Sequence, residues 1–74
     1  MLIPDNIRPE NSVYYNGAKV LEVMLSEKRL GIGDLYLRMR EKMDISMATL
    51  TLSLDWLYLL GCLEVKDGEV VLCL

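Results

Sequence analysis

The sequence predicts a small α+β domain in which three helices precede a C-terminal β-hairpin. Between residues 12 and 60, apolar side chains recur at helical spacing in three separate segments. Two short runs of β-forming residues follow, and Asp67-Gly68, a dipeptide typical of a two-residue hairpin turn, stands between them. A chain of 74 residues has room for one such domain. We therefore expect an extended arm over residues 1–11 and the domain over residues 12–74.

The composition favours a protein partner over nucleic acid or a membrane. The chain is 53% hydrophobic, which is more than one small core needs. Eight Lys and Arg residues stand against eleven Asp and Glu residues, so no basic field attracts phosphates or anionic lipids. No segment approaches the roughly 20 apolar residues that cross a bilayer, and the start of the chain does not resemble a signal peptide. We expect a cytoplasmic protein.

The residues needed for catalysis or metal binding are missing from the sequence. Histidine is absent, and no glycine-rich phosphate loop or paired carboxylates are evident. Cys62 and Cys73 are too few for a disulfide scaffold or a zinc site, so we expect reduced thiols. Asp55 is the one acid inside an apolar helix, and contact with solvent or a partner's cation is favoured over a catalytic role. We expect no enzyme activity, cofactor or metal.

The N-terminal residues predict an extended arm. Pro4 and Pro9 each bias the preceding residue away from helical dihedral angles. A purely polar arm would favour a frayed terminus, but this one carries three aliphatic side chains. Leu2, Ile3 and Ile7 therefore indicate that the arm docks on this domain or on a neighbouring protein.

The first helix is expected to begin at Asn11 or Ser12 and to run to about Ser26. Gly17 within it suggests that another backbone passes close, although an ordinary packing contact is favoured. The expected buried stripe is Val13, Gly17, Val20, Leu21, Met24 and Leu25, widened by Tyr14 and Ala18. The expected polar side is Asn16, Lys19, Glu22 and Ser26.

The second helix is expected after a charged connection over residues 27–31, in which Leu30 makes a single strand-like contact. Its core stripe is Ile32, Leu35, Tyr36, Met39 and Met43. The cations of this region alternate with acids, which favours a solvated face over a phosphate-binding patch. They are Lys28, Arg29, Arg38, Arg40 and Lys42.

The third helix is expected after a cap at Asp44 or Ser46, with Gly61 as a left-handed C-cap. It carries two apolar stripes and no Lys or Arg between residues 46 and 60. The first stripe is Met47, Leu50, Leu54, Leu57 and Tyr58, and the second is Ala48, Leu52, Trp56 and Leu59. Only one stripe can pack on two helices in a chain this short. The other needs the hairpin, the arm or a partner.

The turn at Asp67-Gly68 sets the register of the hairpin, with Lys66 opposite Glu69, Val65 opposite Val70 and Cys62 opposite Cys73. The expected core face is Leu63, Val65, Val70, Leu72 and Leu74. Val71 lies on the other face, beside an outer edge that we expect to be unpaired and therefore open to another chain.

Three helices followed by a hairpin is the order of a winged helix-turn-helix domain. Several segments also resemble the small middle component, family six, of bacterial ABC three-component systems. They are Met1-Leu2-Ile3-Pro4-Asp5, Pro9-Glu10-Asn11-Ser12, Gly17-Ala18 and Leu54-Asp55-Trp56-Leu57-Tyr58-Leu59-Leu60-Gly61.

The resemblance implies a winged helix-turn-helix protein encoded between an ABC-type ATPase and a component that carries an effector. Such systems are proposed to act against phages and other mobile elements. The family offers no catalytic residues to transfer, and a fold alone does not establish a function.

The sequence is therefore consistent with two functions. The first is a non-enzymatic adaptor that binds larger proteins, an ABC-type ATPase and an effector subunit, with a homodimer as a further possibility. The second is a small DNA-binding transcriptional regulator, which the acidic net charge disfavours. The expected partner-binding residues are Leu2, Ile3, Ile7, Ala48, Leu52, Trp56, Leu59 and Val71.

Overall fold

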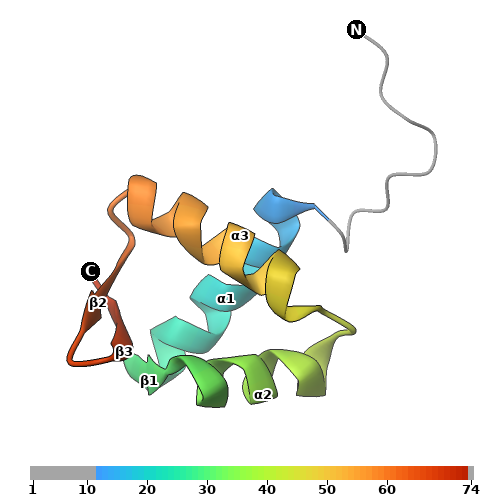
Figure 1. The fold of residues 1–74 in the computed structure, drawn as a ribbon, viewed down its shortest axis with the longest axis horizontal. Helices are drawn as coiled ribbons and strands as arrows, with labels where there is room; N and C mark the ends of the chain where they lie inside the picture. The colour runs from blue at the N-terminus through green and yellow to red at the C-terminus, as the bar shows by residue number, and fades with distance from the viewer. Residues whose placement is uncertain (1–11, 74) are drawn as a thin grey trace, which may run out of the picture.

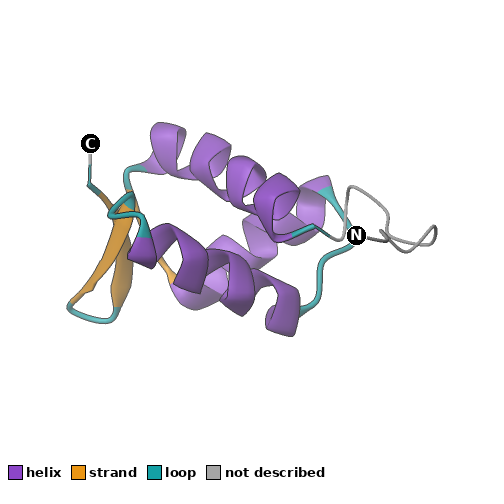
Figure 2. Ribbon diagram, turned by 90° about the horizontal axis from the view of Figure 1, so that it is seen from above, coloured by secondary structure: helices purple, strands orange, loops and turns teal. Residues whose placement is uncertain are grey.

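Three helices form the body of the protein, and a three-stranded sheet lies at one end of them (Figures 1 and 2). This arrangement was obtained as a computed structural model, which describes residues 12–73. The predictions for the arm and for Leu74 lie outside the described residues. The elements are α1 (Val13–Glu27), β1 (Arg29–Gly31), α2 (Ile32–Lys42), α3 (Met47–Leu59), β2 (Leu63–Lys66) and β3 (Glu69–Leu72). The predicted α+β winged helix-turn-helix arrangement is confirmed.

Capping residues set the ends of α1 and α3. The Ser12 hydroxyl accepts a hydrogen bond from the Tyr14 amide at 3.1 Å, and the Ser46 hydroxyl accepts one from the Thr49 amide at 3.1 Å. Of the two predicted caps for α3, Ser46 is therefore the one used. Beyond α3, Gly61 has a φ of 77°, as predicted. The Cys62 amide then donates to the Leu57 carbonyl at 3.0 Å and completes a Schellman motif.

The predicted hairpin register is confirmed, from Leu63 opposite Leu72 to Lys66 opposite Glu69. Both residues of the turn, Asp67 and Gly68, have positive φ, as a two-residue hairpin of this type requires.

The prediction that the outer edge of β3 is unpaired is wrong. The strand order is β1-β3-β2, and β1 pairs antiparallel with β3 along three residues. Leu30, expected to make one strand-like contact, lies in the middle of β1 and opposite Val70. β3 is therefore the central strand, and the two edges of the described sheet are β1 and β2.

The core lies where α1 meets α2, α3 and the base of the sheet. Its fully or nearly fully buried members are Val20, Val23, Met24, Leu35, Met39, Ile45, Leu50, Leu54, Leu57, Leu63 and Val70. Ile45 anchors the turn between α2 and α3, with 2% of its surface exposed. Most of the predicted helix stripes contribute to this core.

Several predictions about the faces of α1 are wrong. Asn16, placed on the polar side, is completely buried, whereas Leu25, placed in the buried stripe, is 51% exposed. Both α2 and α3 pack on α1, so the covered sector of the helix is turned toward Asn16 and Val23 and away from Leu25.

One prediction about the hairpin is wrong as well. Val65 was expected in the core but is 59% exposed, although Val70 opposite it is buried. Val70 lies on the central strand, whereas Val65 lies on the edge strand β2, which projects beyond the helices (Figure 1).

Candidate functional site

The inner face of α3 belongs to the core. Leu50, Leu54 and Leu57 have 0–2% of their surface exposed. Ser53 is also fully buried, and its hydroxyl donates to the Thr49 carbonyl at 2.9 Å, so its polar group is satisfied within the helix. The central leucines of the first predicted stripe therefore pack inside the domain, as expected.

The opposite side of α3 is exposed and mostly apolar. We call it the outer face of α3 and define it by Ala48, Thr51, Leu52, Asp55 and Leu59, all of which are exposed. Leu52 is 58% exposed and Leu59 is 87% exposed. The outer face carries one charged group, Asp55, and no cation.

Trp56 lies at the flank between the two faces of α3. Its indole packs on α1 at Gly17, where a Cβ atom would come within 3.0 Å of the ring atom Cζ3. The Tyr14 ring meets the indole edge to face, with 4.8 Å between ring centroids. The prediction that a backbone passes close to Gly17 is wrong, because an indole occupies that space. The alternative, a packing contact, is confirmed.

Tyr14 extends this surface from α3 onto α1. Sequence reasoning placed Tyr14 in the buried stripe, but it is 69% exposed. The first turn of α1 lies beside Trp56, so one edge of the tyrosine ring packs on the indole while the rest faces solvent. No sequence signal marks this residue, because its exposure depends on where α3 crosses α1.

The predicted partner-binding residues fall into three groups. Ala48, Leu52, Trp56 and Leu59 come together along α3, as helical spacing requires. Val71 belongs to the sheet, where it is half-buried and lies opposite Arg29 on one side and Glu64 on the other. Leu2, Ile3 and Ile7 lie outside the described residues.

Charge is divided unevenly along the described chain. Residues 47–73, which include α3 and the hairpin, contain one cation and four acids, a net charge of −3. Residues 12–46 contain six cations and five acids, a net charge of +1. The half of the domain that a winged helix-turn-helix protein presents to DNA is therefore the acidic half.

Most charged groups of the hairpin are paired. Lys66 lies 3.6 Å from Glu64, and Arg29 on β1 lies 3.6 Å from Asp67. Arg29 also binds Glu69, whose hydrogen bond and charge raise the pKa of the guanidinium. By contrast, Asp55 has no ion pair within residues 12–73.

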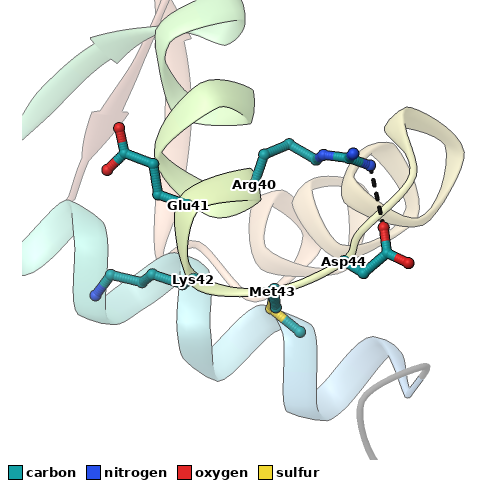
Figure 3. A pocket seen from close by; sticks show the side chains of 5 residues that line it. All are labelled: Arg40, Glu41, Lys42, Met43 and Asp44. Carbon is teal, nitrogen blue, oxygen red and sulfur yellow. Dashed lines mark hydrogen bonds and ion pairs between the residues drawn. The ribbon is translucent and has the colours of Figure 1, made fainter.

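One hollow among the described residues has a volume of about 350 Å³ and lies over the end of α2 and the following turn. Its lining is one continuous run, residues 40–44, in which Arg40 reaches across to Asp44 while Glu41 and Lys42 point away (Figure 3). Arg40 lies 3.2 Å from the Asp44 carboxylate and 3.2 Å from the Ile45 carbonyl. The Arg40 guanidinium therefore stabilises the turn before α3. Because it already binds these two groups, it is poorly placed to bind a ligand.

A smaller hollow of about 100 Å³ lies between α1 and α2. Its lining mixes Glu22, Glu27 and Glu41 with Arg38 and Lys42, and Arg38 lies 3.4 Å from Glu27. Three carboxylates thus outnumber two cations in this hollow, which disfavours the binding of a phosphate. It does not form a phosphate site.

The described residues show little that could perform chemistry. Over residues 12–73 no group of three or more His, Cys, Asp or Glu side chains is arranged to hold a metal ion. Both cysteines are free, and partial desolvation and the Glu64 carboxylate raise the pKa of the Cys73 thiol, which disfavours the reactive thiolate. None of the described helices combines the length and apolar character needed to span a membrane.

The chain was compared with known protein families. Residues 3–73 match the family described as ABC-three component (ABC-3C) system Middle Component 6. Neither a curated protein nor a solved structure matches the chain. Because the match spans nearly the whole sequence, the chain belongs to this family of middle components.

Proposed function

We propose that this member of the Middle Component 6 family is a non-enzymatic adaptor. It links an ABC-type ATPase to an effector component in a bacterial system that acts against phages or other mobile elements. Family membership supports a place in a system with several components. We further propose that the adaptor works in the cytoplasm and binds its partners through apolar contacts.

The outer face of α3 is the observation that carries this proposal. A helix that is apolar nearly all round requires cover nearly all round, and the described domain covers only the inner face. Leu52 and Leu59 remain 58% and 87% exposed. Covering apolar surface contributes roughly 25 cal/mol per Å², so a partner on this face would gain from its burial.

The winged-helix arrangement favours one other function, a DNA-binding regulator. In such proteins the helix that corresponds to α3 enters the major groove, and cations on it and on the wing neutralise phosphates. Here α3 has no Lys or Arg, and the wing tip carries Asp67, whose side chain is 90% exposed. These charges support the adaptor over the regulator.

The adaptor proposal is tested by co-purification from the native operon. The tagged chain is expressed with the other two components, either unchanged or with both Leu52→Asp and Leu59→Asp. We expect the unchanged chain to retain its partners and the doubly substituted chain to lose them, because two carboxylates would be buried in the contact. Retention of both partners by the double variant would contradict the proposal.

Leu37→Asp provides a matched control for this experiment. Leu37 lies on α2 and is 61% exposed, close to the value for Leu52, but it is outside the outer face of α3. The Leu37 variant should keep its partners. Circular dichroism of each variant separates loss of binding from loss of folding.

A gel-shift assay tests the regulator. The purified chain should bind no operator DNA specifically at about 150 mM salt, and any weak retention should weaken steeply between about 50 and 200 mM. Reversing the charges of Arg38 and Lys42, while keeping Arg40 to hold the turn, should leave complex assembly intact. Tight operator binding that these reversals abolish would favour the regulator.

A further inference from the structure

We infer that the partner covering the outer face of α3 is a protein surface that is apolar at its centre and carries an arginine or lysine opposite Asp55. This inference rests on the proposed adaptor function and extends it to the chemistry of the partner. It makes Asp55 the residue that selects the partner, while the surrounding leucines contribute area.

The position of Asp55 places its carboxylate inside the apolar surface. On α3, Thr51 lies one turn before Asp55 and Leu59 one turn after it, and Leu52 lies three residues before it. All of these residues are exposed on the same side of the helix. A partner large enough to cover Leu52 and Leu59 together must therefore also cover Asp55.

The described domain does not neutralise this carboxylate. Asp55 has no ion pair within residues 12–73, unlike the acids of the hairpin. The neighbouring Thr51 hydroxyl donates to the Met47 carbonyl at 2.8 Å, so its proton is already used within the helix. Within residues 12–73 the carboxylate thus has no counter-charge, and a cation on the partner can supply one.

Covering an unpaired carboxylate with apolar surface is unfavourable, because the charge loses its hydration and gains nothing in return. A cation on the partner restores the balance, and the apolar surroundings strengthen the pair. Arginine suits this role best, because its planar fork can bind both carboxylate oxygens and is more weakly hydrated than an ammonium group. The net charge of −3 over residues 47–73 adds a longer-range attraction to a basic partner.

The same charges disfavour the other occupants of this face. A second copy packed about a two-fold axis would bring two acidic faces, each with its own Asp55, against one another. Duplex DNA and anionic membranes would meet an acidic surface without a cation on α3. Each of these alternatives would bring negative charge close to Asp55. A different protein with a basic group would bring positive charge and is therefore favoured.

The test measures binding of the purified full-length chain to the purified ATPase and to the purified effector component. Calorimetry at about 50 and 300 mM salt compares the unchanged chain with Asp55→Asn. Removing one side of a buried charge pair should weaken binding by about 30-fold or more, and the variant should respond less to salt. Asp34→Asn, which neutralises an exposed acid on α2, is the matched control and should bind normally.

A charge exchange then identifies the opposite group. Asp55→Lys should abolish binding to the unchanged partner and should recover it with one single Arg→Glu or Lys→Glu reversal on the partner's surface. A merely structural role for Asp55 would not produce this rescue. Circular dichroism of the Asp55 variants should match that of the unchanged chain, because the side chain is exposed.

Failure of this inference differs from failure of the adaptor proposal. Suppose that Asp55→Asn binds normally while the chain with both Leu52→Asp and Leu59→Asp does not. The outer face of α3 is then still the interface, but the inference of a partner cation opposite Asp55 is wrong. If that double variant also binds normally, the outer face of α3 is not the interface and both conclusions fall. If the unchanged chain binds neither component, the adaptor function itself is wrong.

Discussion

The two faces of α3 contain the same residue type in opposite environments. Leu50 on the inner face is completely buried, whereas Leu59 on the outer face is 87% exposed. Residue type does not explain this difference, because both are leucines in one helix of thirteen residues. The difference follows from packing: α1 and the sheet cover one side of α3, and the described residues offer nothing for the other. Burial of an apolar side chain is favourable wherever it occurs. The packing of the other helices and strands determines whether that burial happens inside the domain.

Two buried polar residues on different helices differ in whether their polar atoms are hydrogen-bonded. Ser53 on α3 and Asn16 on α1 are both fully buried. Ser53 returns its hydrogen bond to its own helix, but neither the Nδ2 nor the Oδ1 atom of Asn16 has a hydrogen-bond partner within residues 12–73. The Ser53 hydroxyl is thus satisfied within its own helix. Burial of the Asn16 amide without a hydrogen bond lowers the stability of the folded domain.

The largest effect is expected from truncating leucines on the two faces of α3. Leu50→Ala should lower the free energy of unfolding by about 2–5 kcal/mol, because it removes fully buried side-chain volume. Leu52→Ala should change it by less than about 0.5 kcal/mol, because that side chain is mostly exposed. Urea denaturation monitored by circular dichroism measures both. Equal losses from the two substitutions would show that both faces belong to one core.

The contact between Gly17 and Trp56 should give the next largest effect. Gly17→Val places side-chain atoms where the indole now lies, within 3.0 Å of Cζ3, and should cost about 1–3 kcal/mol. Displacement of the indole should also shift the fluorescence of Trp56, the single tryptophan.

Gly33→Val is the control for this substitution. Gly33 also lies within a helix, and no atom outside its own local backbone approaches the position of its Cβ within 4 Å. If the Gly17 and Gly33 variants lose equal stability, helix propensity rather than the indole contact would explain the cost.

Replacing Asn16 should raise stability. Leucine has a similar branched shape without the two unpartnered polar atoms, so Asn16→Leu should increase the free energy of unfolding by about 1–2 kcal/mol. Asn16→Asp keeps the shape but buries a charge, and it should destabilise the domain strongly at neutral pH. A loss of stability on Asn16→Leu would indicate that the amide has a hydrogen-bond partner in solution.

The smallest effect concerns the exposed thiol. The raised pKa of Cys73 leaves less thiolate at pH 8 than in an unfolded chain. Alkylation of Cys73 by iodoacetamide in a Cys62→Ala variant should therefore be slower in the folded protein than in denaturant. Because the folded pKa exceeds the unfolded one, the associated stability should be present below the unfolded pKa and be lost as pH rises through the folded value. Faster alkylation in the folded state would contradict this direction.

The three helices and the hairpin could be predicted from the sequence, and so could most of their ends. Ser12, Ser46 and Gly61 act on adjacent backbone groups, so the sequence predicted the cap at Gly61 and narrowed the two N-caps to neighbouring candidates. The Asp67-Gly68 turn set the hairpin register for the same reason. The two stripes of α3 were also evident, because helical spacing alone assigns residues to faces.

Which surfaces are covered depends on contacts in the tertiary structure and could not be predicted from local patterns. The burial of Asn16, the exposure of Tyr14 and Leu25, and the pairing of β1 with β3 all depend on contacts between segments far apart in the sequence. The position of Trp56 depends on both local pattern and tertiary packing. Helical spacing placed it beside Leu52, whereas the crossing of α1 and α3 placed its indole on Gly17. Local patterns specify backbone geometry within a few residues, whereas burial depends on which helix or strand arrives from elsewhere to exclude water.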